Sequence, residues 1–127
     1  MMNFRRLSGL SLFILIPLLA LFAASATAGN EPTAGETIAK GEELFNANCS
    51  KCHGVRGTGS DKGPPLVHRI YHPNHHSDLS FHWAVERGVT AHHWGFGSMP
   101  PIKSLSGQDV DLIIKYVRNL QKEAGIF

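Results

Sequence analysis

The chain has 127 residues, which allows one compact domain and excludes a multidomain enzyme. Its formal net charge at pH 7 is only +2, which excludes a polybasic surface for nucleic acid or anionic membranes. Both cysteines lie in one short motif, so no further thiol remains for a disulfide or a lipid anchor.

The first 28 residues have the three regions of a secretory signal peptide. Arg5 and Arg6 precede an uncharged apolar run at residues 10–24, and small residues at 26–28 form an A-x-A cleavage site. An uncleaved membrane anchor is the alternative, but a bilayer requires about 20 mostly apolar residues. We therefore predict a signal peptide at residues 1–28 and a periplasmic or otherwise extracytoplasmic protein, whose net charge after cleavage is about zero.

The first helix is predicted soon after this segment. Residues 29–35 are small and polar and are expected to form a flexible lead-in to a domain at residues 36–124. Within residues 36–48, Ile38 and Phe45 lie among good helix formers, which predicts an N-terminal helix.

Two more helices are predicted from capping residues. Asp78 can cap a short helix that Gly88 ends, and Ser106 and Asp109 form a capping-box-like pair before a longer one. The apolar residues of that last helix follow at i, i+3, i+4, i+7 and i+10: Val110, Ile113, Ile114, Val117 and Leu120. No stretch alternates apolar and polar residues as a strand would, so the predicted class is all-α with long loops.

The motif at residues 49–53 carries the chemistry. Cys49, Cys52 and His53 form C-x-x-C-H, in which both thiols can add to haem vinyl groups and the histidine reaches the iron. The alternatives are a thioredoxin-like dithiol, expected near a βαβ pattern, and half of a zinc site, which requires further ligands. The motif, the preceding helix and the export signal together favour covalent haem.

Met99 is the candidate for the second iron ligand, because it is the only methionine after the predicted signal peptide. A thioether is a soft ligand that raises the reduction potential, as an electron carrier requires. Pro100 and Pro101 would stiffen the loop that holds the sulfur. The alternative for a lone methionine is simple core filling.

With these motifs, residues 36–122 resemble the class I, small monohaem cytochrome c family. The match runs through residues 41–45, 49–54, 63–66, 99–101 and 105–106. The resemblance implies the small cytochrome c fold, three to four helices with long loops wrapped around one covalently bound haem c.

The resemblance also implies roles for single residues. Gly41 and Phe45 would cross the C-terminal helix closely, at Leu112, Ile113 and Tyr116. The Pro64 carbonyl would accept a hydrogen bond from the second ring nitrogen of the iron-ligating histidine. Leu66 would pack on the haem face.

The function implied is that of a single-electron carrier and not an enzyme. The expected partners are redox proteins such as a respiratory oxidase, a reductase or a dehydrogenase, with no nucleic acid. The protein is expected to be a monomer that meets membranes only through these partners, unless the signal segment is retained. The alternative is a catalytic or ligand-binding haem protein in which Met99 dissociates.

Seven histidines beyond His53 depart from the family pattern: His68, His72, His75, His76, His82, His92 and His93. Imidazole is the commonest metal ligand, so His72, His75 and His76, completed by His92 or His93, can form a copper or zinc site. The alternative is a set of hydrogen-bonded loop histidines. The sequence leaves both readings open.

Overall fold

The structure is a computed structural model that describes residues 31–127, so the predicted signal peptide at residues 1–28 lies outside the described residues. It contains four α-helices: α1 (Ala34–Asn48), α2 (Ser50–His53), α3 (Asp78–Arg87) and α4 (Gly107–Glu123). Short 3₁₀ turns lie at Val55–Gly57 and Arg69–Tyr71. The described part contains no strand, only one isolated β-bridge, which confirms the all-α class.

α1 begins two residues before the predicted start, because Thr33 caps it. The Thr33 hydroxyl accepts from the backbone N–H of Glu36, and the Glu36 carboxylate accepts from the backbone N–H of Thr33. This reciprocal capping box pairs two N–H groups that the first turn of a helix leaves without partners. Residues 34 and 35 are therefore helical and do not belong to a lead-in.

No helix within residues 31–127 has the length and apolar character to cross a membrane.

α4 has the predicted capping box and the predicted apolar face. Ser106 and Asp109 exchange the same pair of hydrogen bonds as Thr33 and Glu36 do in α1. The five apolar residues at helical spacing are all buried: Val110, Ile113, Ile114, Val117 and Leu120. Burying each such side chain contributes about 1.5–3 kcal/mol, so this face supplies most of the core.

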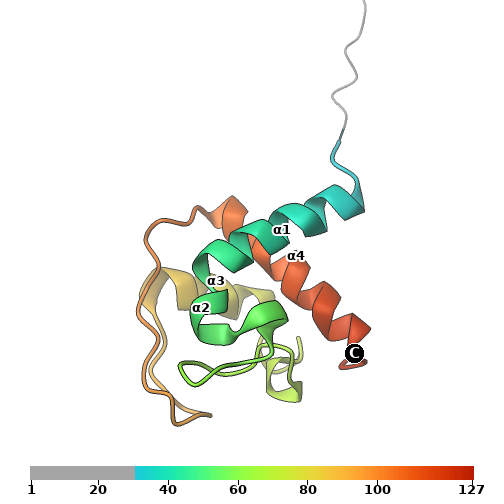
Figure 1. The fold of residues 1–127 in the computed structure, drawn as a ribbon. Coiled ribbons are helices and arrows are strands. Elements are labelled where there is room, and N and C mark those ends of the chain that lie inside the picture. The colour runs from blue at the N-terminus through green and yellow to red at the C-terminus, as the bar shows by residue number, and fades with distance from the viewer. Residues whose placement is uncertain (1–30) are drawn as a thin grey trace, which may run out of the picture. The chain divides into compact units, whose positions relative to one another are not determined.

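α1 and α4 cross one another (Figure 1). They approach most closely at Gly41, a contact that the resemblance implied. A Cβ on Gly41 would overlap the Leu112 carbonyl and lie 2.9 Å from the Tyr116 Cβ. Phe45 is fully buried one turn further along α1, with its ring centroid 5.5 Å from that of Tyr116. Only a residue without a side chain allows the two backbones to approach so closely.

α3 lies where it was predicted, but the prediction that Asp78 caps it is wrong. Ser77 occupies the cap position, and Asp78 is the first helical residue. The Asp78 carboxylate instead accepts from Arg118 Nε at 2.8 Å. Gly88 ends the helix with φ 79°, in agreement with the prediction. The ion pair therefore joins the start of α3 to α4.

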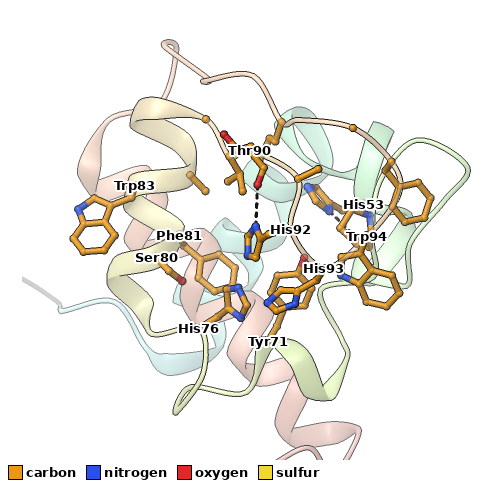
Figure 2. Close-up of a pocket in the computed structure, with 18 residues that line it drawn as sticks. His53, Tyr71, His76, Ser80, Phe81, Trp83, Thr90, His92, His93 and Trp94 are labelled. Carbon is orange, nitrogen blue, oxygen red and sulfur yellow. Dashed lines mark hydrogen bonds between the residues drawn. The ribbon is translucent and has the colours of Figure 1, made fainter.

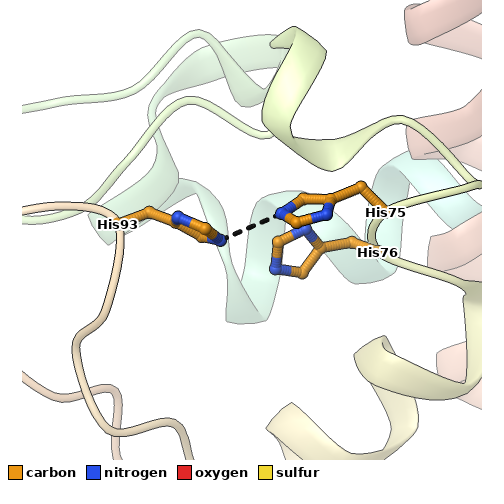
Figure 3. A group of neighbouring side chains, drawn as sticks. All are labelled: His75, His76 and His93. Atoms are coloured by element: carbon orange, nitrogen blue, oxygen red, sulfur yellow. Dashed lines mark hydrogen bonds between the residues drawn. The ribbon is translucent and has the colours of Figure 1, made fainter.

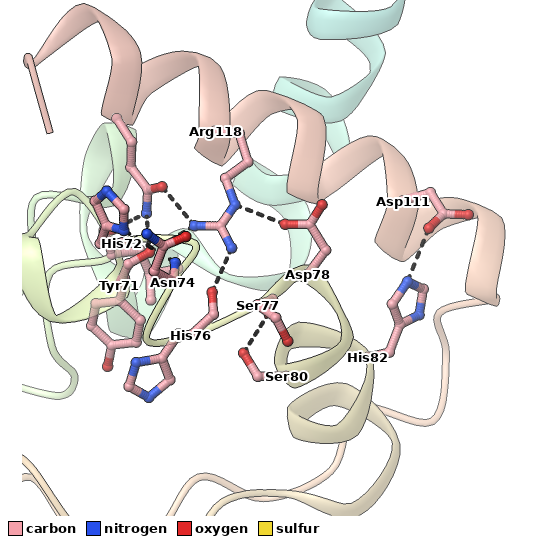
Figure 4. A network of polar contacts seen from close by, with 12 residues as sticks. Tyr71, His72, Asn74, His76, Ser77, Asp78, Ser80, His82, Asp111 and Arg118 are labelled. Carbon is pink, nitrogen blue, oxygen red and sulfur yellow. Dashed lines mark hydrogen bonds and ion pairs between the residues drawn. The ribbon is translucent and has the colours of Figure 1, made fainter. Parts of the chain in front are cut away.

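A buried polar network fastens the loop before α3 to α4 (Figure 4). The Arg118 guanidinium, only 8% exposed, donates to the carbonyl oxygens of Tyr71 and His76 at 2.6 Å each. Gln121 is fully buried and donates to the carbonyls of Leu66 and Tyr71. Backbone acceptors that would otherwise be costly to bury are thus satisfied, and residues 66–78 are held against the helix.

Candidate functional site

Cys49, Cys52 and His53 lie in a single turn at the junction of α1 and α2. The backbone N–H groups of Cys52 and His53 both donate to the Cys49 carbonyl, at 3.1 and 2.9 Å. Residues three and four positions apart in a helical turn share a face. The turn therefore presents both thiols and the imidazole on one side.

Gly54 directs the chain back toward this turn. It ends α2 with φ 76°, and a Cβ there would collide with the backbone of Gly59. The Gly59 N–H donates to the His53 carbonyl at 2.7 Å, which closes the loop. Residues 63–66 are thereby brought next to the motif, with Gly63 in contact with the Cys52 backbone.

His53 is fixed in one tautomer by Pro64. The ring nitrogen Nδ1 lies 2.8 Å from the Pro64 carbonyl oxygen, so Nδ1 carries the proton and donates it. Burial lowers the pKa of His53, and this hydrogen bond opposes the shift only in part. The imidazole is therefore neutral at pH 7, and Nε2 keeps a free lone pair for a metal.

His53 lines a cavity of about 530 Å³, of which Figure 2 gives a close-up. Met99, far from His53 in the sequence, lines the same cavity. A volume of about 300–1,000 Å³ is usual for cofactor sites. The backbones of Met99 and Val89 exchange two hydrogen bonds of 2.9 Å, which closes the loop between them and holds Met99 in the wall.

Aromatic side chains form much of the cavity wall: Tyr71, Phe81, Trp83, Trp94 and Phe96. Trp94 Nε1 is buried and has no hydrogen-bond partner among the described residues. Burial raises the pKa of Tyr71. A buried N–H without an acceptor is costly, so a ligand that brings one would stabilise this wall.

These features fit the predicted haem. One cavity holds an imidazole with a free Nε2 and a thioether, and apolar aromatic walls suit the porphyrin faces. The unpaired Trp94 N–H suits an acidic substituent such as a propionate. From the sequence alone, the aromatic residues Phe81, Trp83, Trp94 and Phe96 could belong either to the core or to a cofactor pocket, and all four line the cavity. Tyr71 carried no sequence signal, because its place depends on the Arg118 network.

Three residues assigned to the haem are not among those that line the cavity. Burial, with a smaller effect of Cys52, raises the pKa of the half-buried Cys49 thiol to about 11. Cys52 is exposed. Leu66 is buried in the core with Phe45 and Val117. Their roles toward the haem stay predictions.

The other histidines separate into two groups. His76, His92 and His93 line the cavity, and His75 reaches His93 from outside it. The other three histidines form different hydrogen bonds. His68 accepts from the Ile70 N–H, His72 accepts from the Asn74 N–H, and His82 pairs with the Asp111 carboxylate. The prediction that His72 belongs to a metal site with His75 and His76 is wrong. The His72 ring packs on Phe127 instead.

Comparison with known proteins agrees with this geometry. The family model described as Cytochrome c matches residues 38–121, more than half of the chain. Searches of curated proteins and of solved structures gave no match. The matched range contains the C-x-x-C-H turn, Met99 and the crossing of α1 with α4.

Proposed function

The chain belongs to the cytochrome c family, and on that premise we propose that it carries single electrons through one covalently bound haem c, held between His53 and Met99. Membership implies the covalent haem. The observation that carries the ligand assignment is the single cavity lined by both His53 and Met99. When bound, the haem supplies an iron that alternates between the ferric and ferrous states.

The chain's own residues would tune and protect this group. The Pro64 carbonyl orients the His53 ring and makes Nε2 a better donor. The Met99 thioether favours the ferrous state and so raises the reduction potential. The aromatic walls would offer apolar surface to the porphyrin. Members of the cytochrome c family generally carry electrons, which is why we propose a carrier and not an enzyme.

Export and redox partners are part of the proposal. The basic, apolar and small-residue regions of residues 1–28 support export, which suits the extracytoplasmic setting typical of the family. The mass of the protein recovered from the periplasm tests cleavage after Ala28. The proposed partners are an oxidase, a reductase or a dehydrogenase. With a net charge of about zero, docking would depend on local surface patches.

The test of the ligand assignment is Met99→Ala, with Ile102→Ala as a control that leaves the methionine in place. We expect the haem to stay attached, the charge-transfer band of methionine on ferric haem to disappear, and the potential to fall by on the order of 0.1 V. The control should keep the parent spectrum and potential.

Two outcomes would contradict the proposal. A Met99→Ala protein with the parent spectrum and potential would show that another residue, such as His92 or His93, is the ligand. Rapid cyanide binding by the parent protein, equal to that of the variant, would show an open iron and favour the catalytic or ligand-binding alternative.

A further inference from the structure

Three histidines from two separate loops meet at the edge of the cavity (Figure 3). His75 and His76 precede α3, and His93 lies in the loop between Val89 and Met99. One ring nitrogen from each lies within 4.8 Å of the others. No carboxylate belongs to this group, so an ion would meet imidazole nitrogen only.

The spacing of the nitrogens suits a shared ion. The Nε2 atoms of His75 and His93 lie 3.2 Å apart and face one another. Two histidine nitrogens bound tetrahedrally to one zinc ion, each at about 2.0–2.1 Å, are separated by about 3.3 Å. A cation could therefore replace the hydrogen bond between these two rings with little movement of either side chain.

His76 is already in the tautomer that a metal requires. Its Nδ1 lies 2.7 Å from the Ile70 carbonyl oxygen, so Nδ1–H donates and Nε2 is left with its lone pair. A carbonyl that holds the second ring nitrogen is the usual support of a metal-bound histidine. The same arrangement fixes His53 through Pro64.

The protonation state also favours metal binding. Burial lowers the pKa of His76, the hydrogen bond to Ile70 opposes this shift in part, and the neighbouring His75, His92 and Arg118 lower the pKa further. Desolvation and the imidazoles of His92, His76 and His75 lower that of His93. Both rings are therefore neutral at pH 7, and a neutral imidazole is the form that binds metal.

Hydrogen bonds to the backbone fix both loops that carry the three histidines. Arg118 donates to the backbone carbonyl of His76 at 2.6 Å and to that of Tyr71. The paired hydrogen bonds between Val89 and Met99 close the loop that carries His93. A site whose backbone is fixed requires little ordering when an ion binds.

We propose that His75, His76 and His93 bind one divalent transition-metal ion, a site separate from the haem iron. Imidazole ligands suit both copper and zinc, and at a given nitrogen site Cu²⁺ binds more tightly than Zn²⁺. Three protein ligands leave the remaining positions to water. The proposal does not depend on electron transfer.

The test is calorimetric titration of Cu²⁺ and of Zn²⁺ into the haem-loaded protein, prepared without a polyhistidine tag. We expect one equivalent to bind, Cu²⁺ more tightly than Zn²⁺. His75→Ala and His93→Ala should each weaken binding at least about tenfold, since even loss of a ligand's supporting partner costs that much. The matched control is His82→Ala, which removes an imidazole bonded to Asp111.

Binding should also weaken from neutral pH to about pH 5.5, where histidines become protonated. Far-ultraviolet circular dichroism must match the parent in every variant compared. His75 is exposed and does not line the cavity, so the haem spectrum of His75→Ala must match the parent as well. Absence of saturable binding by the parent, or equal affinity in the parent, His75→Ala and His93→Ala, would overturn the proposal.

Discussion

At the scale of single residues, the chemistry depends on side chains whose partners are distant in the sequence. His53 is kept neutral and oriented by the Pro64 carbonyl, and Met99 is held in the cavity wall by Val89. The C-x-x-C-H motif alone led to the prediction that His53 is an iron ligand. The partner of His53 followed only from the family resemblance, and the pairing of Val89 with Met99 followed from neither, because one isolated bridge leaves no periodic pattern.

Replacing both Cys49 and Cys52 by alanine should abolish covalent attachment. Without either thiol no thioether can form, so all the haem should be extractable into acidified organic solvent. The measurement is the fraction of haem that stays with the protein after extraction.

The control for this experiment is Lys51→Ala, because Lys51 lies exposed between the two cysteines and leaves both thiols in place. It should retain haem as the parent does. Haem that resists extraction from the double variant would refute attachment through this motif.

At the scale of the helices, those with clear capping or terminating residues were predicted well. Capping residues and apolar spacing located α4, and Gly88 located the end of α3. α2 was not predicted, since four residues are too few to show a period. Asp78 was misassigned because a carboxylate at a helix start serves equally as a cap or as a partner for a distant arginine, and only the fold decides between them.

Gly41→Ala should destabilise the domain through the crossing of α1 and α4. The added methyl group would overlap the backbone of Leu112 and crowd Tyr116, and overpacking of this kind costs about 1–3 kcal/mol. Urea unfolding of the haem-loaded protein measures the free energy of unfolding.

Gly35→Ala is the matched control in the same helix. A Cβ at position 35 meets only the Thr33 hydroxyl, at 4.0 Å. Because alanine favours helix over glycine by roughly 0.5–1 kcal/mol, this control should be neutral or slightly stabilising. Equal effects of the two variants would mean that close contact at Gly41 does not limit stability.

At the scale of the whole molecule, the buried Arg118 joins α4, α3 and the loop that carries His75 and His76. A sequence signal for it existed: Arg118 and Gln121 follow Ile114 at i+4 and i+7, on the buried side of α4. Polar residues on such a face are either exposed or fully paired, and the sequence does not distinguish the two. The sequence offered either His92 or His93 to complete the group of His75 and His76. That His93 joins the group and His72 does not depends on how the two loops are held, which no local pattern shows.

Arg118→Met should lower the free energy of unfolding by about 2–4 kcal/mol, since the His76 carbonyl loses its charged donor and Asp78 its partner. The Asp78 carboxylate is largely exposed, which limits its share. Lys115→Met, an exposed position on the same helix, is the control and should change little. If both variants unfold at the same urea concentration, the Arg118 network is not a determinant of stability.

The crossing of α1 with α4 has a consequence for the order of events as the chain is made. A 15-residue helix such as α1 is only marginally stable alone, and Phe45 is buried only when α4 is present. The chain emerges from its amino end, so the C-x-x-C-H turn appears well before residues 107–123. During that interval the two thiols belong to an unfolded segment and are open to modification. We therefore expect the prosthetic group to be attached most readily before the last helix docks on the first, while the Cys49 thiol is still open to solvent.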